Sequence, residues 1–286
     1  MHDAGTLYGA IVVERFRTFA GNLFELADRW KRFSYGLTTL DIDFSLSQQE
    51  FANSCNQLLD VNRELVTLAG DVSVVAVASP GEVDNETATP SIVFHLSPLP
   101  WKKLSNWYQF GTSLFLSSYA AVPDACWPAH IKTRSRLPYY LSDVELRKNQ
   151  RTTPKTSSIE ALPLLKTVRG TIADTSVANI VIVDKNGVIR SPATGSSLEG
   201  CSLELAKRLL RSCGQNLVRT DIDESELYVA REVWLTGSTG CIWRASSLNA
   251  KSIGTDTESP IYRHLKAKWI EHVGLDFEAQ AMCFAT

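Results

Sequence analysis

Apolar residues recur at helical and strand spacings along the first third of the chain. Leu26, Trp30 and Phe33 fall on one helical face, which predicts a helix around them. A second helix is expected to begin at Ser47, because Ser-Gln-Gln-Glu is a capping-box pattern and an apolar face follows it. Apolar runs between and around these helices predict strands at residues 11–17, 65–69, 72–78 and 92–96. The first part of the chain should therefore be an α+β unit.

A β-hairpin is predicted at residues 180–190. Two β-branched runs flank the dipeptide Asn186-Gly187, and both of these turn residues tolerate a positive φ angle. The residues before the hairpin are expected to form a loop that carries one acid, Asp174. The hairpin would then determine the direction in which Asp174 points.

The rest of the second half also alternates between helices and strands. Periodicity and capping residues predict helices over 141–147 and after the Gly- and Ser-rich residues 195–202, a strand at 161–165, and a last helix that starts at Ser259-Pro260. Residues 118–128 contain prolines and show no periodicity, which indicates a connection between domains. We expect an α/β (α+β) protein with a small domain over residues 1–118, a linker over 119–128 and a larger domain over 129–286.

Composition narrows the classes of function. The 286 residues carry a formal net charge of −2 with 21% charged residues, so the chain offers no basic field for nucleic acid. No apolar run approaches the roughly 18 residues that a membrane span needs, and no secretory signal is visible, which favours a cytoplasmic protein. The six cysteines are scattered, without a CxxC pair or a metal-ligand spacing, so no metal site is expected.

The segment around Asp174 resembles a motif of the class IV aminotransferases, the pyridoxal-phosphate (PLP) family that includes branched-chain and D-amino-acid aminotransferases and 4-amino-4-deoxychorismate lyase. Members show an acid, a trio of small residues, then Asn and an apolar strand. Asp174, the trio 175–177 and Asn179 stand in that order. The resemblance implies that Asp174, in place of the usual Glu, pairs with the cofactor ring nitrogen.

Two further landmarks lie upstream in the order that the family shows. Lys132 begins the segment Lys-Thr-Arg-Ser-Arg-Leu, which is similar to the family context of the Schiff-base lysine, with Ser135 in place of Asn and Arg136 as in the lyases. Arg32 matches the arginine that binds the cofactor phosphate in the family. Each residue taken alone could be an ordinary surface charge.

Two downstream landmarks complete the resemblance. Cys201 and Ser202 follow Gly200 where family members have Leu-Pro-Gly-(Ile/Val)-Thr-Arg, and a helix start after such a loop is suited to hold a phosphate. Glu199 replaces the proline of that pattern and would repel a phosphate if its side chain faced it. Ser238 and Thr239 match the hydroxyl donors of a Thr-Gly-Thr loop. Both stretches could equally be an ordinary helix cap and an ordinary turn.

The resemblance spans nearly the whole chain and implies a two-domain fold type IV PLP enzyme, with a small α/β domain and a larger pseudo-barrel domain. It implies transamination between an amino acid and a 2-keto acid through a Lys132 Schiff base, in a homodimer. Elimination of pyruvate from aminodeoxychorismate is one alternative. A family member that has lost PLP chemistry and acts as a binding protein is another, because Ser135, Asp174 and Glu199 depart from the pattern.

Overall fold

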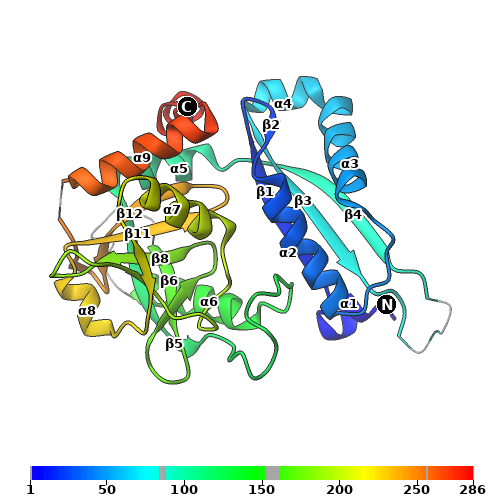
Figure 1. The fold of residues 1–286 in the computed structure, drawn as a ribbon. Helices are drawn as coiled ribbons and strands as arrows, with labels where there is room; N and C mark the ends of the chain where they lie inside the picture. The colour runs from blue at the N-terminus through cyan, green and yellow to red at the C-terminus, as the bar shows by residue number, and fades with distance from the viewer. Residues whose placement is uncertain (1, 84, 86–87, 153–160, 256, 286) are drawn as a thin grey trace. The chain divides into compact units, whose positions relative to one another are not determined.

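The structure is a computed structural model that describes residues 2–83, 85, 88–152, 161–255 and 257–285 (Figure 1). The chain divides into two compact units, and their boundaries differ from those expected. Residues 1–99 and 130–136 form the first unit, whereas residues 100–129 and 137–286 form the second. The small domain was expected to continue to residue 118, but residues 112–120 are a strand of the second unit's sheet.

In the described residues, the first unit is a four-stranded antiparallel sheet with helices packed on it (Figure 1). The strand order is β2-β1-β3-β4. The strands are β1 (Val12–Phe19), β2 (Asn22–Leu23), β3 (Val72–Ser79) and β4 (Ser91–Pro98), and the helices are α1 (Ala4–Tyr8), α2 (Leu26–Thr39), α3 (Gln48–Val61) and α4 (Arg63–Ala69).

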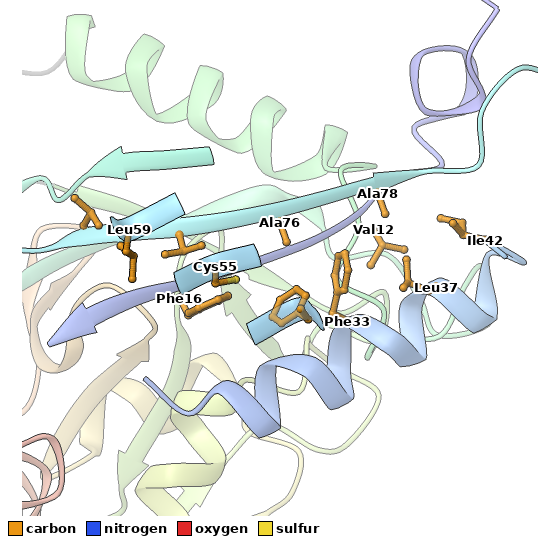
Figure 2. Packing of buried hydrophobic residues seen from close by; sticks show 12 residues of the cluster. Val12, Phe16, Phe33, Leu37, Ile42, Cys55, Leu59, Ala76 and Ala78 are labelled. Carbon is orange, nitrogen blue, oxygen red and sulfur yellow. The ribbon is translucent and has the colours of Figure 1, made fainter. Parts of the chain in front are cut away.

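The core of the first unit lies between this sheet and helices α2 and α3. Figure 2 shows Val12 and Phe16 of β1 beside Phe33 of α2 and Cys55 of α3, and all four side chains are almost completely buried. Burying each such side chain contributes about 1.5–3 kcal/mol relative to exposure. The helical face predicted from the sequence is therefore the face that forms the core.

Three sequence predictions can be compared with this unit. The helix around Trp30 is confirmed as α2, and the capping box of Ser47 is confirmed at the start of α3. The strand predicted at residues 65–69 is wrong, because this segment is helix α4. The amide of Val66 in α4 donates to the carbonyl of Asn62 at 2.9 Å, so a new helix starts directly after α3. Leu65 and Leu68 stay largely exposed, so these two apolar residues do not form the buried face that the strand prediction assumed.

Residues 130–136 belong to the first unit although they follow much of the second unit in the sequence. The amide of Val13 donates to the carbonyl of Lys132 at 2.8 Å, and the amide of Arg134 donates to the carbonyl of Ile11 at 3.1 Å. These backbone bonds bring Lys132 beside β1. The expectation that Lys132 belongs to the larger domain is therefore corrected, because β-type pairing with β1 holds the segment.

The second unit contains a nine-stranded sheet within the part of the chain that is described, and it is surrounded by helices. The strands are β5 (Thr112–Ala120), β6 (Ala161–Lys166), β7 (Ile172–Thr175), β8 (Asn179–Val183), β9 (Ile189–Ser191), β10 (Leu217–Arg219), β11 (Glu232–Gly237), β12 (Cys241–Leu248) and β13 (Lys251–Ser252). The helices are α5 (Trp101–Phe110), α6 (Leu137–Thr152), α7 (Cys201–Ser212), α8 (Glu224–Val229), α9 (Pro260–Val273) and α10 (Phe277–Phe284).

Part of this sheet closes on itself. The strands follow the order β8-β11-β12-β5-β6-β7, and β7 pairs again with β8. The pairing that closes this ring joins Asp174 to Asn179. The predicted two-domain fold with a pseudo-barrel is thereby confirmed.

The predicted hairpin is confirmed as β8 and β9, which pair antiparallel through Ile182 and Arg190. Gly187 has a φ of 87°, and Asp184 Oδ1 accepts hydrogen bonds from the amides of Asn186 and Val188 at 2.8 and 2.9 Å. Asp174, however, was expected in a loop and lies in strand β7. Closure of the ring at this residue is the reason, because the pairing with Asn179 requires an extended backbone.

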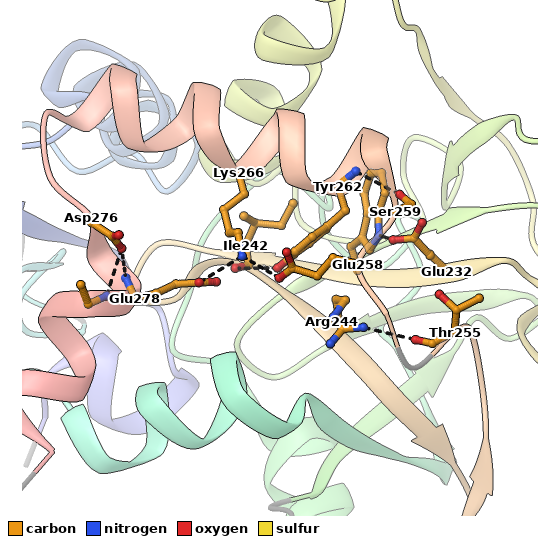
Figure 3. A network of polar contacts seen from close by, with 12 residues as sticks. Glu232, Ile242, Arg244, Thr255, Glu258, Ser259, Tyr262, Lys266, Asp276 and Glu278 are labelled. Carbon is orange, nitrogen blue, oxygen red and sulfur yellow. Dashed lines mark hydrogen bonds and ion pairs between the residues drawn. The ribbon is translucent and has the colours of Figure 1, made fainter.

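The C-terminal helices are held against the barrel by buried aromatic residues and a polar network. Trp269 of α9 and Phe277 of α10 are fully buried. Figure 3 shows Lys266 of α9 between Glu258 and Glu278, with Nζ to carboxylate distances of 2.6 and 3.0 Å. Among the described residues, no helix combines the length and apolar character needed to cross a membrane.

Candidate active site

The first unit gathers charged groups around Lys132. Glu14 of β1 is completely buried and accepts two hydrogen bonds from Arg32 of α2, from Nε to Oε2 at 2.8 Å and from Nη2 to Oε1 at 2.7 Å. Arg29, one helical turn earlier, places Nη1 3.7 Å from Glu14 Oε1. Two arginines and one lysine therefore surround a single buried carboxylate.

This arrangement shifts two pKa values. Burial lowers the pKa of Lys132 to about 7, and the positive charge of Arg32 adds to that effect, whereas the negative charge of Glu14 opposes it. Burial alone would raise the pKa of Glu14, but Arg32 outweighs it by charge and hydrogen bonding, so that pKa lies below its usual value. Lys132 is therefore poised to lose its proton near neutral pH, and a neutral amine is a nucleophile and a proton acceptor.

The second unit holds Asp174 in a defined orientation. Its side chain lies where the sheet closes, and the residue is only 4% exposed. The hydroxyl of Tyr139, from the first turn of α6, donates to Asp174 Oδ1 at 2.8 Å. The ring of Tyr139 packs against buried Ala121, Leu165 and Ala173, so the donor is itself fixed. A carboxylate held in this way can pair with a positively charged group.

The start of α7 is tied to β8, the strand that pairs with β7 at Asp174. Asn179 donates from Nδ2 to the carbonyl of Leu198 at 2.8 Å, two residues before the cap residue Gly200. A Cβ at Gly200 would lie 2.0 Å from Asn179 Oδ1, so the loop can approach β8 only because this residue is glycine. Gly200 has no side chain with which to cap α7, and the first amides of the helix are donors for an anion.

Two buried hydroxyl groups lie on elements that pack together here. Ser202 Oγ is on the first turn of α7 and Thr236 Oγ1 is on β11, against which α7 packs. Neither oxygen has a hydrogen-bond partner within the described part of the chain. Ser238 and Thr239 follow Thr236 in the turn between β11 and β12 and are half-buried. Buried hydroxyls normally have partners, so this pair of oxygens indicates a site for a polar ligand.

The sequence matches a known protein family over most of its length. The family model described as amino-transferase class IV matches residues 11–248. The chain belongs to the class IV aminotransferase family. Membership implies PLP as the cofactor, and among the described residues no cluster of His, Cys, Asp and Glu could hold a metal ion.

Two curated class IV relatives align over most of the chain at low identity. D-alanine aminotransferase of Bacillus licheniformis is 21% identical over 271 residues, which cover 93% of this chain and 88% of that protein. A putative branched-chain-amino-acid aminotransferase of Methanocaldococcus jannaschii is 24% identical over 269 residues, with 93% and 88% covered.

Solved structures support the fold. A branched-chain amino acid aminotransferase of Escherichia coli superimposes with a TM-score of 0.82 at 18% identity, over 96% of this chain and 88% of that chain. A putative 4-amino-4-deoxychorismate lyase of Legionella pneumophila gives a TM-score of 0.79 at 15% identity, over 96% and 94%. The class IV fold is thus shown for nearly the whole chain.

The residues present are chemically suited to PLP. PLP carries an aldehyde and a phosphate. Lys132, an amine with a pKa of about 7, suits the aldehyde. The start of α7, which has no side-chain cap, and two buried hydroxyls without partners among the described residues suit the phosphate. The predicted site residues fall into two sets: Arg32 and Lys132 lie in the first unit, and Asp174, Cys201, Ser202, Ser238 and Thr239 lie in the second.

Sequence reasoning missed two residues that contact these sets, and a third that contacts Glu199 beside the second set. Glu14 and Tyr139 touch predicted site residues, and Arg219 forms an ion pair with Glu199 at 3.5 Å. The position of Glu14 within an apolar strand could have revealed its role, because a buried carboxylate needs a cationic partner. No local pattern marks the other two.

Proposed function

We propose that this protein catalyses PLP-dependent transfer of an amino group between an amino acid and a 2-keto acid, with Lys132 Nζ as the covalent attachment point of the cofactor. The observation that carries the proposal is the environment of Lys132, whose pKa is lowered to about 7 beside Arg32 and Glu14. Nearly all other lysines in proteins remain protonated at neutral pH and cannot attack an aldehyde.

Each predicted residue has a distinct task in this proposal. Arg32 supplies positive charge to the phosphate, and the bond to Glu14 fixes the plane of its guanidinium group. The first amides of α7 at Cys201 and Ser202, and the hydroxyls of Ser238 and Thr239, donate to phosphate oxygens. Asp174 pairs with the ring nitrogen and keeps it protonated. The bound cofactor supplies an electron sink for the bond that breaks at the substrate carbon.

Lys132 also has a role in proton transfer. With the cofactor and substrate bound, Lys132 Nζ would accept the proton from the substrate carbon and return it. A pKa lowered to about 7 makes that exchange possible near neutral pH, because both protonation states are populated.

Reduction and mapping of the cofactor-loaded protein test the proposal. PLP is added, the mixture is treated with borohydride, and the modified lysine is identified by peptide mass mapping. We expect the label on Lys132, no label in Lys132→Ala, and normal labelling in Lys102→Ala, an exposed matched control. A parent protein that acquires no label would instead support the binding-protein alternative. Label on another lysine would remove Lys132 from its proposed role.

A panel of amino acids identifies the reaction and the substrate. Purified protein loaded with PLP is mixed with L- and D-amino acids, and formation of the matching 2-keto acid is measured. Elimination of pyruvate from aminodeoxychorismate is the second candidate function, which Arg136 favours because it stands where the lyases carry arginine. Release of pyruvate without any dependence on a keto acid would favour that reaction.

A homodimer and a cytoplasmic location are further parts of the proposal. The homodimer rests on what the family implies, and the cytoplasmic location is the expectation drawn from the sequence. Sedimentation of the purified protein tests the dimer, and fractionation of cells tests the location.

A further inference from the structure

The loop between β9 and α7 is held at both ends by one arginine. Arg219 of β10 donates from Nε to the carbonyl of Pro192 at 2.6 Å and from Nη2 to the carbonyl of Ala193 at 3.5 Å. The same Nη2 lies 3.5 Å from Glu199 Oε1. The Arg219 side chain is only 12% exposed, and its three contacts hold the guanidinium group in place. One side chain thus joins residues at the beginning of the loop to the residue just before the cap of α7.

Glu199 places a negative charge beside the predicted phosphate site, where a negative charge is unfavourable for binding. It stands where the class IV pattern has proline, immediately before the cap residue Gly200, so its carboxylate belongs to the segment that leads into the buried first turn of α7. A negative charge near a helix start interacts favourably with the helix dipole and competes with any other anion for it. The contact with Arg219 offers a way to remove that competition.

We propose that Arg219 is a positioning residue for a phosphate-bearing ligand, because it draws the Glu199 carboxylate away from the start of α7 and balances its charge. The inference rests on the proposed function, since the phosphate in question is that of PLP. Arg219 itself contacts no reacting atom in this proposal. Replacing Arg219 should therefore weaken the affinity for ligands that carry a phosphate and leave the affinity for ligands without a phosphate unchanged.

Asn179 explains why the position of this loop matters. The side-chain amide nitrogen of Asn179 binds the carbonyl of Leu198, which precedes Glu199. The side-chain oxygen of Asn179 packs against Gly200, which follows Glu199. The backbone on both sides of Glu199 is therefore fixed, and only its side chain can turn. Without Arg219, the nearest favourable place for the carboxylate is the start of α7, where the helix dipole is positive.

The test is a double-mutant cycle read by ligand affinity. The dissociation constants of PLP and of pyridoxal, which lacks the phosphate, are measured for the full-chain parent, Arg219→Gln, Glu199→Gln and the double variant. We expect Arg219→Gln to weaken PLP about tenfold, a size typical of a charge at a helix end, and to leave pyridoxal within about twofold. The double variant should recover most of the PLP affinity, because it no longer contains the unbalanced carboxylate.

Two additional variants keep the test decisive. Arg169→Gln is the matched control, because Arg169 forms an ion pair in the same unit, 3.3 Å from Asp221, with 66% of its side chain exposed. It should not change either constant. Arg219→Lys keeps the charge but not the bonding pattern of the guanidinium group, and it should retain most of the PLP affinity even if Arg219→Gln fails to fold.

The outcomes separate this inference from the proposed function. If PLP binds the parent at Lys132 but Arg219→Gln affects PLP and pyridoxal equally, or the double variant shows no recovery, Arg219 has only a structural role and the inference is wrong. Equal losses in Arg219→Lys and Arg219→Gln would also overturn it, since charge would not matter. A parent that binds no PLP contradicts the proposed function itself.

Discussion

At the scale of single residues, the charges around Lys132 predict opposite effects for two neighbours. Glu14 raises the pKa of Lys132, so Glu14→Gln should lower that pKa further below about 7. Arg32 lowers it, so Arg32→Ala should raise it toward the ordinary lysine value. The measurement is the pH dependence of Lys132 acetylation by acetic anhydride in the cofactor-free protein, followed by peptide mass mapping, with Lys102 as an internal reference.

The direction of each change is what matters in that experiment. A lysine reacts only as the neutral amine, so a lower pKa moves the onset of acetylation to lower pH, and a higher pKa moves it to higher pH. If Glu14→Gln and Arg32→Ala move the onset in the same direction, the charges shown around Lys132 do not control its titration.

Asp174 makes a second prediction for a single residue. Asp174→Asn should still bind PLP, because Lys132 and the phosphate contacts remain. The half-reaction with an amino acid should slow by roughly two orders of magnitude or more, since the amide cannot hold the ring nitrogen protonated. Single-turnover kinetics measure this step. Asp174→Glu, which restores the residue usual in the family, should keep much of the rate.

Tyr139 provides the control for Asp174. Tyr139→Phe removes the hydrogen bond to Asp174 Oδ1 but leaves the ring and the carboxylate in place. We expect a smaller loss than in Asp174→Asn and an altered pH dependence of the cofactor absorbance. An Asp174→Asn variant that reacts as fast as the parent would show that this acid does not serve the cofactor ring.

At the scale of elements, the junction between β8 and α7 depends on the absence of a side chain at Gly200. Gly200→Ala would place a Cβ 2.0 Å from Asn179 Oδ1, so the Asn179 side chain would have to turn away and give up its bond to the carbonyl of Leu198. We expect a loss of about 1–3 kcal/mol in the free energy of unfolding and weaker PLP binding. Urea unfolding and ligand titration measure the two effects.

Shortening Asn179 tests the cause of that effect. Asn179→Ala removes the atom that the new Cβ would meet, although it also removes the bond to the carbonyl of Leu198. The double variant should therefore be more stable than the sum of the two single losses predicts. Additive losses would mean that crowding against Asn179 is not the reason for glycine at this position.

At the scale of the whole molecule, the network of Figure 3 joins α9, α10 and the segment before them. Lys266 lies between Glu258 and Glu278, and these side chains keep only 16–26% of their surface exposed. Burial lowers the pKa of Lys266, but its bonds to the two glutamates outweigh that effect, so the pKa is raised. This contribution to stability is present below the ordinary lysine pKa and is lost as the pH rises through the raised value.

Lys266→Met should destabilise the protein by about 1–3 kcal/mol, because two carboxylates then lie together without a cation. Burial already raises the pKa of Glu278, and loss of Lys266 should raise it further. The folded variant therefore binds a proton more readily than the unfolded chain, so lowering the pH from 8 to 5 should recover part of its stability. Thermal unfolding of parent and variant at both pH values measures this. Equal losses at the two pH values would argue against repulsion between the carboxylates.

Local sequence patterns determined much of the secondary structure. The Asn186-Gly187 turn, the capping box at Ser47 and the apolar face of α2 act through neighbouring residues, so each could be predicted without knowledge of the fold. The order of the motifs was likewise sufficient to indicate the class IV family, which the match over residues 11–248 confirmed. The assignments of Lys132, Asp174 and Arg32 to the cofactor remain predictions.

Contacts between distant residues were decided only by the tertiary structure. Lys132 joins the first unit because its backbone pairs with β1, more than a hundred residues earlier in the chain. Asp174 is in a strand because the ring of strands closes there. In helix α4, Val66 and Ala69 pack against the core while Leu65 and Leu68 stay exposed, a one-sided contact that the apolar run alone did not reveal. Arg219 meets Glu199 only because β10 lies parallel to β9. Periodicity reports which face of an element is apolar, whereas the partner of that face and the pKa of each charge depend on segments that the fold brings together.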